Sequence, residues 1–537
     1  MTSNNVDFDL WPVPSLPPSR TSPSRLPGVT PGSTQALREV LRRNHENWHV
    51  FFDDFGRHNH ISHRVLAAWA MGAQSAIVRE GYDTNEHMQK PRGTSPGQIT
   101  PENFKEHLGD RRFYDAYVRF YTELVRTKGF SFVLEEYVFS PYANFASTSK
   151  DGKRPEMLGR FCDGLLHPMI HAGYGVEFGL PGMFVEGLAM TSINPFHNNI
   201  AIPPDLFASV EVLRETPTVE LPNTIQQAST RLKSVLQQVT GSPTVATLKT
   251  DVHAFDVLAR IIDDPEIARP SGVHDRPYRA VIAACGNAIY RRTNEWSVTP
   301  SSIQAKIEEA QWAATLLYAI SGFNQPKDGG FNADFLAYVI YVFPVAHETD
   351  APLASMHFVT SALFLPSFAA YLSPPSQVLL LRSYLTVCIA WWVSLGKPRL
   401  DIPAFFAAGI PHTATVTSTS RFSSNQLSVP RSQIAGSNPN PWTAVIRDAL
   451  IHPDDHVPKL VRSLVHFGAL YGGTEAGHFG HTELKGAEQI DGTLFVRAAE
   501  LTMARLGREF KVVPPLQIYW DRVPSAAGAK NPDQTAV

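Results

Sequence analysis

The sequence has little cysteine, no excess of charge of either sign and no targeting segment. Its 537 residues include three cysteines, Cys162, Cys285 and Cys388, which are far apart in the chain. This excludes a disulfide scaffold, a thiolate zinc site and a cysteine-ligated iron–sulfur cluster. Lysine and arginine total 47 against 50 acidic residues, so we expect no nucleic-acid partner, because phosphate binding needs a basic surface. A reducing, cytoplasmic location fits this composition best.

Long apolar runs are also scarce. The N-terminus contains acidic residues and prolines and has no basic segment, so we expect no leader peptide. The most apolar stretch, residues 378–395, is nearly long enough to cross a bilayer but includes Arg382, Ser383 and Thr386. We therefore predict a buried core helix there and no membrane span.

Helical periodicity of apolar residues dominates the remaining sequence. Two-residue alternation and hairpin signals are rare, so we predict a mainly α protein with one large helical domain. The segments with helical periodicity are 60–78, 111–129, 160–179, 224–241, 251–264, 302–322, 356–372 and 458–473.

The boundaries of this domain follow from composition. Residues 1–33 contain seven prolines and are predicted to form a flexible arm, with helix starting at Ser33 or Thr34. The helical domain is placed at 34–523, with a flexible tail at 524–537. Residues 413–437 hold eleven Ser or Thr and no acidic residue, which predicts a surface insertion.

The twenty histidines are the most informative feature, because many of them fall into four groups. The groups are His58-Asn59-His60-Ile61-Ser62-His63, His167-Pro168-Met169-Ile170-His171, Met356-His357-Phe358-Val359-Thr360 and His456-Val457-Pro458-Lys459. Spacings of three and four residues place side chains on one helix face. Each group alone is typical of hydrogen-bonded core histidines. Together they are equally compatible with a shared metal site, since buried imidazoles need partners and bind Fe, Zn, Cu or Ni.

A lysine and two residues that follow His171 are further candidates at a shared metal site. Spacing alone makes Lys459 a surface lysine beside Asp454 and Asp455, but a buried lysine can react with CO2 to give an anionic carbamate ligand. Tyr174 and Glu177 follow His171 and can either orient an imidazole or be ordinary core and surface residues. The GYGVEFG segment departs from the GxGxxG dinucleotide pattern, and no flavin site is seen.

Four motifs in this order, HNHISHRVLAAWAMGA, HPMIHAGYGVEF, MHFVT and HVPKLVRSL, resemble the questin oxidase family of fungal secondary metabolism. The resemblance spans about residues 44–497. It implies Baeyer–Villiger-type oxidation that opens the ring of an anthraquinone or related aromatic polyketide, with O2 as co-substrate. Other members are NADPH-dependent, so the resemblance leaves NADPH open as a co-substrate, which the sequence itself neither supports nor excludes.

The resemblance also implies a non-heme Fe(2+) site of four histidines and one carboxylated lysine. By motif, we expect His60, His171 and His357 with either His167 or His456 as ligands. Lys459 would be the modified lysine, and Thr360 would lie against the metal. Tyr174 is the second candidate catalytic residue. A Baeyer–Villiger monooxygenase using NADPH, and a non-catalytic helical protein that binds a hydrophobic polyketide intermediate, remain alternatives.

Overall fold

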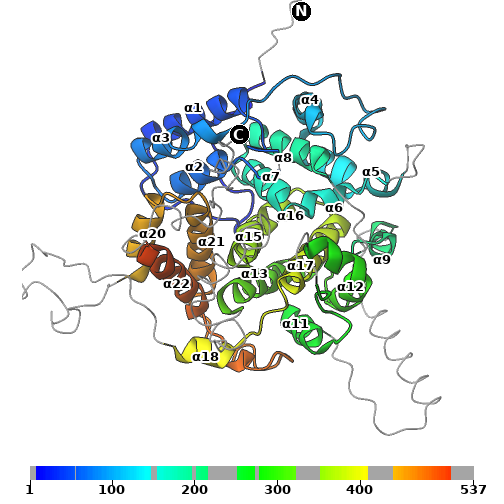
Figure 1. The fold of residues 1–537 in the computed structure, drawn as a ribbon, viewed down its shortest axis with the longest axis vertical. Coiled ribbons are helices and arrows are strands. Elements are labelled where there is room, and N and C mark those ends of the chain that lie inside the picture. The colour runs from blue at the N-terminus through cyan, green and yellow to red at the C-terminus, as the bar shows by residue number, and fades with distance from the viewer. Residues whose placement is uncertain are drawn as a thin grey trace, which may run out of the picture.

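The computed structural model describes residues 8–54, 56–146, 154–195, 201–215, 251–272, 277–321, 351–408 and 440–509. Within these ranges the regular elements are all helices, and β structure is limited to isolated bridges. The mainly α prediction is therefore confirmed. Figure 1 shows the helices gathered around a shared interior, with helices from the two ends of the described chain side by side.

In chain order the helices are α1 (Pro31–Asn47), α2 (Ile61–Ala70), α3 (Ser75–Asp83), η1 (Glu86–Met88), η2 (Arg111–Phe113), α4 (Tyr114–Leu134), η3 (Glu135–Phe139), α5 (Pro141–Phe145), α6 (Met157–Cys162), α7 (His167–Phe178), α8 (Pro181–Ile193), α9 (Pro204–Glu215), α11 (Ala254–Asp263), α12 (Pro277–Asn294), α13 (Ile303–Ile320), α15 (Ala351–Ala362), α16 (Leu365–Ala369), α17 (Pro374–Ser394), α18 (Ile402–Ala407), α20 (Pro441–Leu450), α21 (His456–Tyr471), η6 (Ala487–Gln489) and α22 (Thr493–Glu509).

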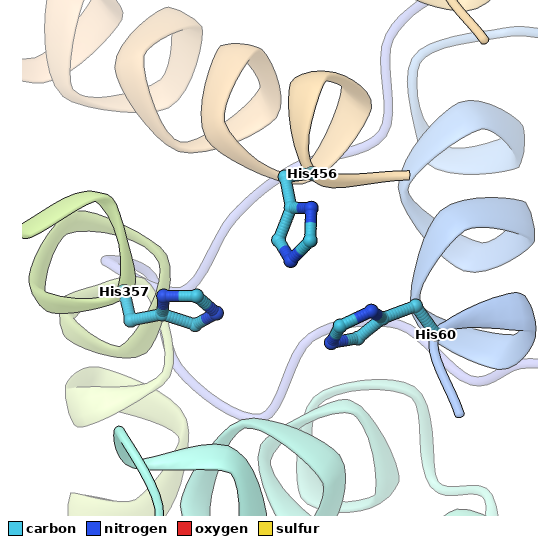
Figure 2. A group of neighbouring side chains, drawn as sticks. All are labelled: His60, His357 and His456. Atoms are coloured by element: carbon cyan, nitrogen blue, oxygen red, sulfur yellow. The ribbon is translucent and has the colours of Figure 1, made fainter. Parts of the chain in front are cut away.

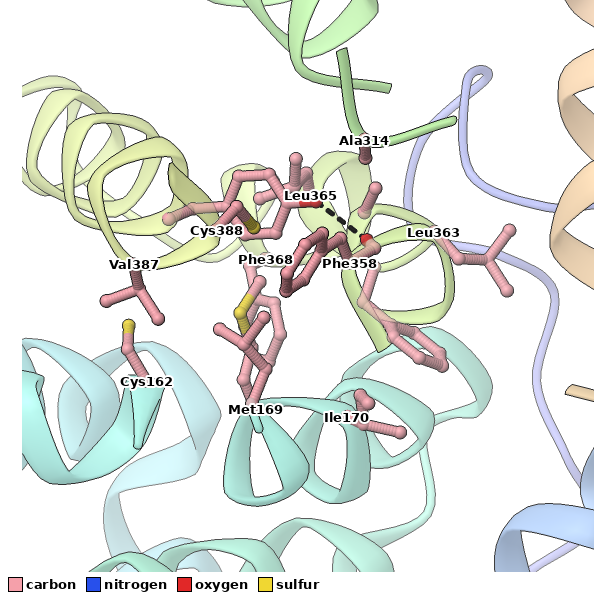
Figure 3. Packing of buried hydrophobic residues seen from close by; sticks show 14 of the residues in the cluster. Cys162, Met169, Ile170, Ala314, Phe358, Leu363, Leu365, Phe368, Val387 and Cys388 are labelled. Atoms are coloured by element: carbon pink, nitrogen blue, oxygen red, sulfur yellow. Dashed lines mark hydrogen bonds between the residues drawn. The ribbon is translucent and has the colours of Figure 1, made fainter. Parts of the chain in front are cut away.

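The core is built around helices that are buried on every side. All residues of α7 are buried, and α8 packs closely on it, with Gly187 directly against the backbone of Ala172. Figure 3 shows side chains of α7, α15, α16 and α17 meeting in the apolar interior, including Met169, Phe358 and Phe368. The histidines of α7 and α15 are therefore carried by helices that the apolar core holds rigidly.

Helix α17 is long and apolar enough to cross a membrane by length and composition alone, but 89% of its most apolar window is buried inside the structure. This is the pattern of a core helix, as predicted for residues 378–395. All three cysteines lie in the described residues, and each is free and buried.

The helix predicted at 160–179 is interrupted. Helix α6 ends at Cys162, and α7 begins at His167 after Leu165 and Leu166, which both have positive φ. Such φ values cost conformational energy for non-glycine residues and end a helix. Pro168 lies in the first turn of α7, where a missing N–H group is tolerated.

The N-terminal segment differs from the prediction of a flexible arm. Residues 8–30 have no regular secondary structure and lie against the helices: the Trp11 side chain is 3% exposed, and Ser367 donates a hydrogen bond to Ser22 at 2.9 Å. Helix α1 begins at Pro31, earlier than predicted, because Thr30 and Ser33 form a capping box. The prolines disfavour helix in this segment, but burial of its few large apolar residues fixes it in place.

Several predicted features lie outside the described residues: the helix at 224–241, the insertion at 413–437 and the tail at 524–537.

Candidate metal centre

Three histidines from distant parts of the chain meet in the interior. His60 is the N-cap residue of α2, His357 lies in α15 and His456 is the first residue of α21. One ring nitrogen from each lies within 4.8 Å of the others, and all three side chains are buried. Figure 2 shows the three rings directed toward a common space between their helices. Among the described residues, this is the group whose spacing suits a single metal ion.

The ring of His456 is held by Asp454. Its Nδ1–H donates to Asp454 Oδ1 at 2.9 Å, and the backbone N–H of His456 donates to the same oxygen at 2.8 Å. Because Nδ1 carries the proton, a neutral ring keeps its lone pair on Nε2. A carboxylate that orients an imidazole in this way is a common partner of metal-binding histidine.

A fourth histidine, His167, adjoins the three. Its Nδ1–H donates to the carbonyl oxygen of Gly164 at 2.7 Å, and its Nε2 lies 2.8 Å from Nε2 of His60. A carbonyl can only accept, so the lone pair of neutral His167 is on Nε2, toward His60. The left-handed turn before α7 brings the Gly164 carbonyl into this position.

Burial controls the protonation of this cluster. It lowers the pKa of His60, His63 and His167 well below the usual imidazole value, and charges on Lys459 and neighbouring rings lower it further. Burial likewise lowers the pKa of His58, which stacks on His167 at 3.9 Å, to about 3. These four rings are therefore neutral near pH 7, the form in which imidazole binds metals.

Lys459 is buried, which corrects the surface position that spacing alone favoured. It is 1% exposed and lies one turn after His456 on α21. Its charge contributes to the lowered pKa of His58, His60 and His167, so it faces the histidine cluster.

His171, in contrast, does not join the three-histidine group. Its Nε2–H donates to Glu186 Oε2 at 2.8 Å, and its Nδ1 lies 3.0 Å from Nε2 of His63. Glu186 also accepts a hydrogen bond from His45 Nδ1 at 2.6 Å. Both ring nitrogens of His171 are thus engaged away from His60, His357 and His456, although the family resemblance of its motif made it an expected ligand.

The two candidate catalytic residues, Tyr174 and Thr360, lie beside histidines of this interior group. The ring of Tyr174 is 5.5 Å from that of His63 and 4.7 Å from that of Phe364. Thr360 is buried one turn after His357, and its hydroxyl donates to the His357 carbonyl at 3.3 Å.

Similarity to known proteins identifies the family of this chain. A profile described as "Questin oxidase-like" matches residues 57–464. The chain belongs to this family. Questin oxidase of Aspergillus terreus is 23% identical over 458 residues, which cover 84% of each chain. Baeyer-Villiger oxidase GME11358 of Pestalotiopsis microspora is 23% identical over 452 residues, 82% of each chain.

A third relative matches over a shorter region. Oxidoreductase AflY of Aspergillus parasiticus is 34% identical over 169 residues, 30% of this chain and 32% of its own. The names of these questin oxidase-like relatives support an oxidoreductase. The matched profile includes His60, His167, His357 and His456.

The four motifs do not predict two residues that lie beside the three-histidine group. His63 appears in its motif only as a neighbour of His60, and Glu186 lies in none of the motifs. Glu186 is the one charged residue in α8, PGMFVEGLAMTSI, which is otherwise apolar or small. A lone carboxylate in such a helix must be buried with a partner, and this signal could have identified it.

Proposed function

We propose that this protein is an O2-dependent oxidase that opens a ring of an anthraquinone or related aromatic polyketide at a non-heme iron site. The observation that carries the proposal is the convergence of His60, His357 and His456 within 4.8 Å in a buried interior. We infer that His167 is the fourth histidine ligand and that a carboxylated Lys459 is the fifth. His171 is left out, because His63 and Glu186 engage both of its ring nitrogens.

The donor set suits such an ion. Two nitrogens that bind one ion at about 2.1 Å and at right angles lie about 3 Å apart, close to the 2.8 Å between His60 and His167. His456 and His167 both have Nδ1–H engaged by an oxygen acceptor, so the lone pair of each ring in its neutral form lies on Nε2. Four imidazoles and one carboxylate-like oxygen favour iron over a softer metal ion.

Lys459 fits the role of a carbamate. Its neutral amine would attack CO2, forming an N–C bond and releasing one proton, and the product is an anionic oxygen ligand. A carbamate on Lys459 would replace the ammonium group by an anionic oxygen ligand, which a bound divalent ion stabilises.

The iron would supply redox chemistry by binding and activating O2. The chain's own residues hold the ligand rings in a fixed tautomer and orientation through Asp454 and the Gly164 carbonyl. The buried surroundings exclude water from the reacting groups. The family resemblance of the four motifs and the name of the questin oxidase relative support an aromatic polyketide substrate.

Metal analysis of anaerobically purified protein tests this proposal. We expect close to one iron per chain, together with activity on a hydroxylated anthraquinone that a chelator abolishes and ferrous iron restores. Iron far below one per chain, with activity unaffected by the chelator, would contradict the proposal. A variant at exposed His87, His87→Ala, serves as the control, and His357→Ala should lose both metal and turnover.

Two alternatives give different results in the same assay. The Baeyer-Villiger names of the relatives favour a monooxygenase that draws electrons from NADPH. It would consume one NADPH per ring opened, whereas a dioxygenase consumes none. A non-catalytic binding protein would bind the polyketide without turnover, and its His357→Ala variant would bind normally.

A further inference from the structure

Helix α2, which follows His60 directly, carries a buried arginine. All residues of α2 are buried, and apart from His63 its one ionisable side chain is that of Arg64. Arg64 is 7% exposed. A guanidinium group stays protonated in proteins and is costly to bury unless acceptors surround it. The acceptors of Arg64 therefore show which part of the chain it holds.

Those acceptors lie in the segment just before α21. Nη1 of Arg64 donates to the carbonyl oxygen of Pro453 at 2.8 Å and to Asp455 Oδ1 at 3.0 Å. A terminal guanidinium nitrogen has two hydrogens, so both bonds can form at once. Asn85, which lies between α3 and η1, donates to the same oxygen of Asp455 at 3.2 Å. We call these four residues the Arg64 clamp, which joins segments that are 389 or more positions apart in the chain.

Both sides of the Arg64 clamp carry a proposed metal ligand. The clamped segment includes Asp454, which accepts hydrogen bonds from Nδ1 and from the backbone N–H of His456. On α2, the backbone N–H of Arg64 donates to the carbonyl oxygen of His60 at 2.9 Å, one helical turn earlier. The rings of His60 and His456 are 4.4 Å apart between centroids, and Figure 2 shows them facing the same space from the starts of their helices.

We propose that Arg64 is a positioning residue of the metal site, which fixes the spacing of His60 and His456 by tying α2 to the segment before α21. This deepens the proposed function and rests on it, because it requires an ion between these rings. Ligands on separate helices bind one ion tightly only when each is held within about 0.5 Å of its bound position. The planar guanidinium fixes its acceptors in direction, which the ammonium group of a lysine does not.

A glycine on α3 leaves room for the Arg64 side chain. A Cβ atom at Gly81 would lie 3.3 Å from Arg64 Nε and 3.0 Å from Val65 Cγ1, closer than ordinary van der Waals contact. Gly81 lies inside α3 and does not have a positive φ, so its backbone conformation does not require glycine, which is less favourable than alanine within a helix. Its neighbours, including Arg64, account for it.

Cobalt(II) binding to the metal-free, full-length protein tests the proposal. Co2+ accepts imidazole ligands, and its visible absorption reports both the dissociation constant and the coordination geometry. In Arg64→Met we expect the dissociation constant for Co2+ to rise about 10-fold and the absorption bands to shift, as is typical when a group that orients metal ligands is removed. Arg64→Lys, which keeps the charge but not the planar fork, should recover part of the affinity.

A matched arginine outside the site separates positioning from stability. Arg260 also joins distant segments, because it donates to Glu295 at 2.6 Å and to Glu483 at 2.8 Å. Arg260→Met should lower the unfolding free energy but leave the dissociation constant and the spectrum of bound Co2+ unchanged, since these segments carry no proposed ligand. Each titration is made on protein shown to be folded by circular dichroism, so a loss of stability alone does not alter the result.

Each other outcome overturns the inference. Equal dissociation constants for the wild type and Arg64→Met would make the clamp purely structural and leave the metal site to stand. Equal losses of affinity in Arg64→Met and Arg260→Met would also contradict positioning. Wild-type protein that binds no Co2+ would contradict the proposed metal site and this inference with it. If Arg64→Met does not fold, Gly81→Ala displaces the Arg64 side chain without removing it and should bind Co2+ more weakly than Gly473→Ala. Equal binding by these two variants would contradict the role of Arg64.

Discussion

His60 and His167 face each other with their Nε2 atoms 2.8 Å apart, although 107 positions separate them in the chain. Without an ion, one of the two nitrogens must carry a proton for this distance to be favourable. With an ion, both lone pairs can point at the same centre. The 2.8 Å contact between α2 and α7 can therefore be stabilised either by a proton shared between the two rings or by an ion that both rings bind.

Ferrous iron should stabilise the folded protein. Added anaerobically at about 100 times its dissociation constant, it should raise the unfolding free energy by about 2.7 kcal/mol, since it binds only the folded state. The measurement is urea denaturation of chelated protein with and without iron. His357→Ala should show no increase, whereas His87→Ala should behave as the wild type. An equal increase in His357→Ala would place the iron elsewhere.

Carboxylation of Lys459 should be visible directly. Protein incubated with 13C-labelled bicarbonate and ferrous iron should gain a carbamate carbon signal in NMR, recorded after exchange to a diamagnetic divalent ion. Lys459→Met should lack the signal and bind iron more weakly, because it removes the anionic ligand. A matched change at exposed Lys90, Lys90→Met, should retain it. Retention of the signal in Lys459→Met would show that another lysine reacts.

Replacement of Gly187 by alanine should disturb the contact between α7 and α8. The added methyl carbon would lie 2.4 Å from the backbone nitrogen of Ala172, so the helices must move apart at a cost of about 1–3 kcal/mol. Because Glu186 precedes this residue, the variant should also weaken the hydrogen bond to His171. Gly473→Ala is the control, since its added carbon meets nothing within 4 Å. Equal unfolding free energies for the two variants would contradict the predicted clash.

Acid should destabilise the protein partly through His49. Burial lowers its pKa from 6.5 to about 4, so between these values the unfolded state binds more protons than the folded state. The unfolding free energy should therefore fall as the pH falls below 6.5, by up to about 1.4 kcal/mol per pH unit from this residue. Urea denaturation at pH 7 and pH 5 should show a smaller loss in His49→Gln than in the wild type. In His87→Gln, at an exposed position, the loss should be unchanged.

Much of the fold could be predicted because apolar periodicity is local information. The patterns at 111–129, 251–264 and 302–322 correspond to α4, α11 and α13. The interruption before α7 could not be predicted, because Leu165 and Leu166 give no local signal for positive φ. Their conformation is imposed by tertiary packing, which overrides residue preference.

The site could be predicted only in part, for a geometric reason. Spacing places His167 and His171 on one face of α7, but it also separates them by one helical turn. One can therefore adjoin His60 while the other faces His63 and Glu186. Which of the two does so depends on the neighbouring helices α2 and α8, and this information is absent from the motif itself.

The histidines that converge here are contributed by α2, α7, α15 and α21, which are spread from the first to the last part of the described chain. A nascent polypeptide that has not yet reached α21 lacks His456 and Lys459, and so cannot offer a complete coordination shell. On the proposed assignment of the ligands, metal loading would follow synthesis of α21, and a chain truncated before α21 would not hold the ion.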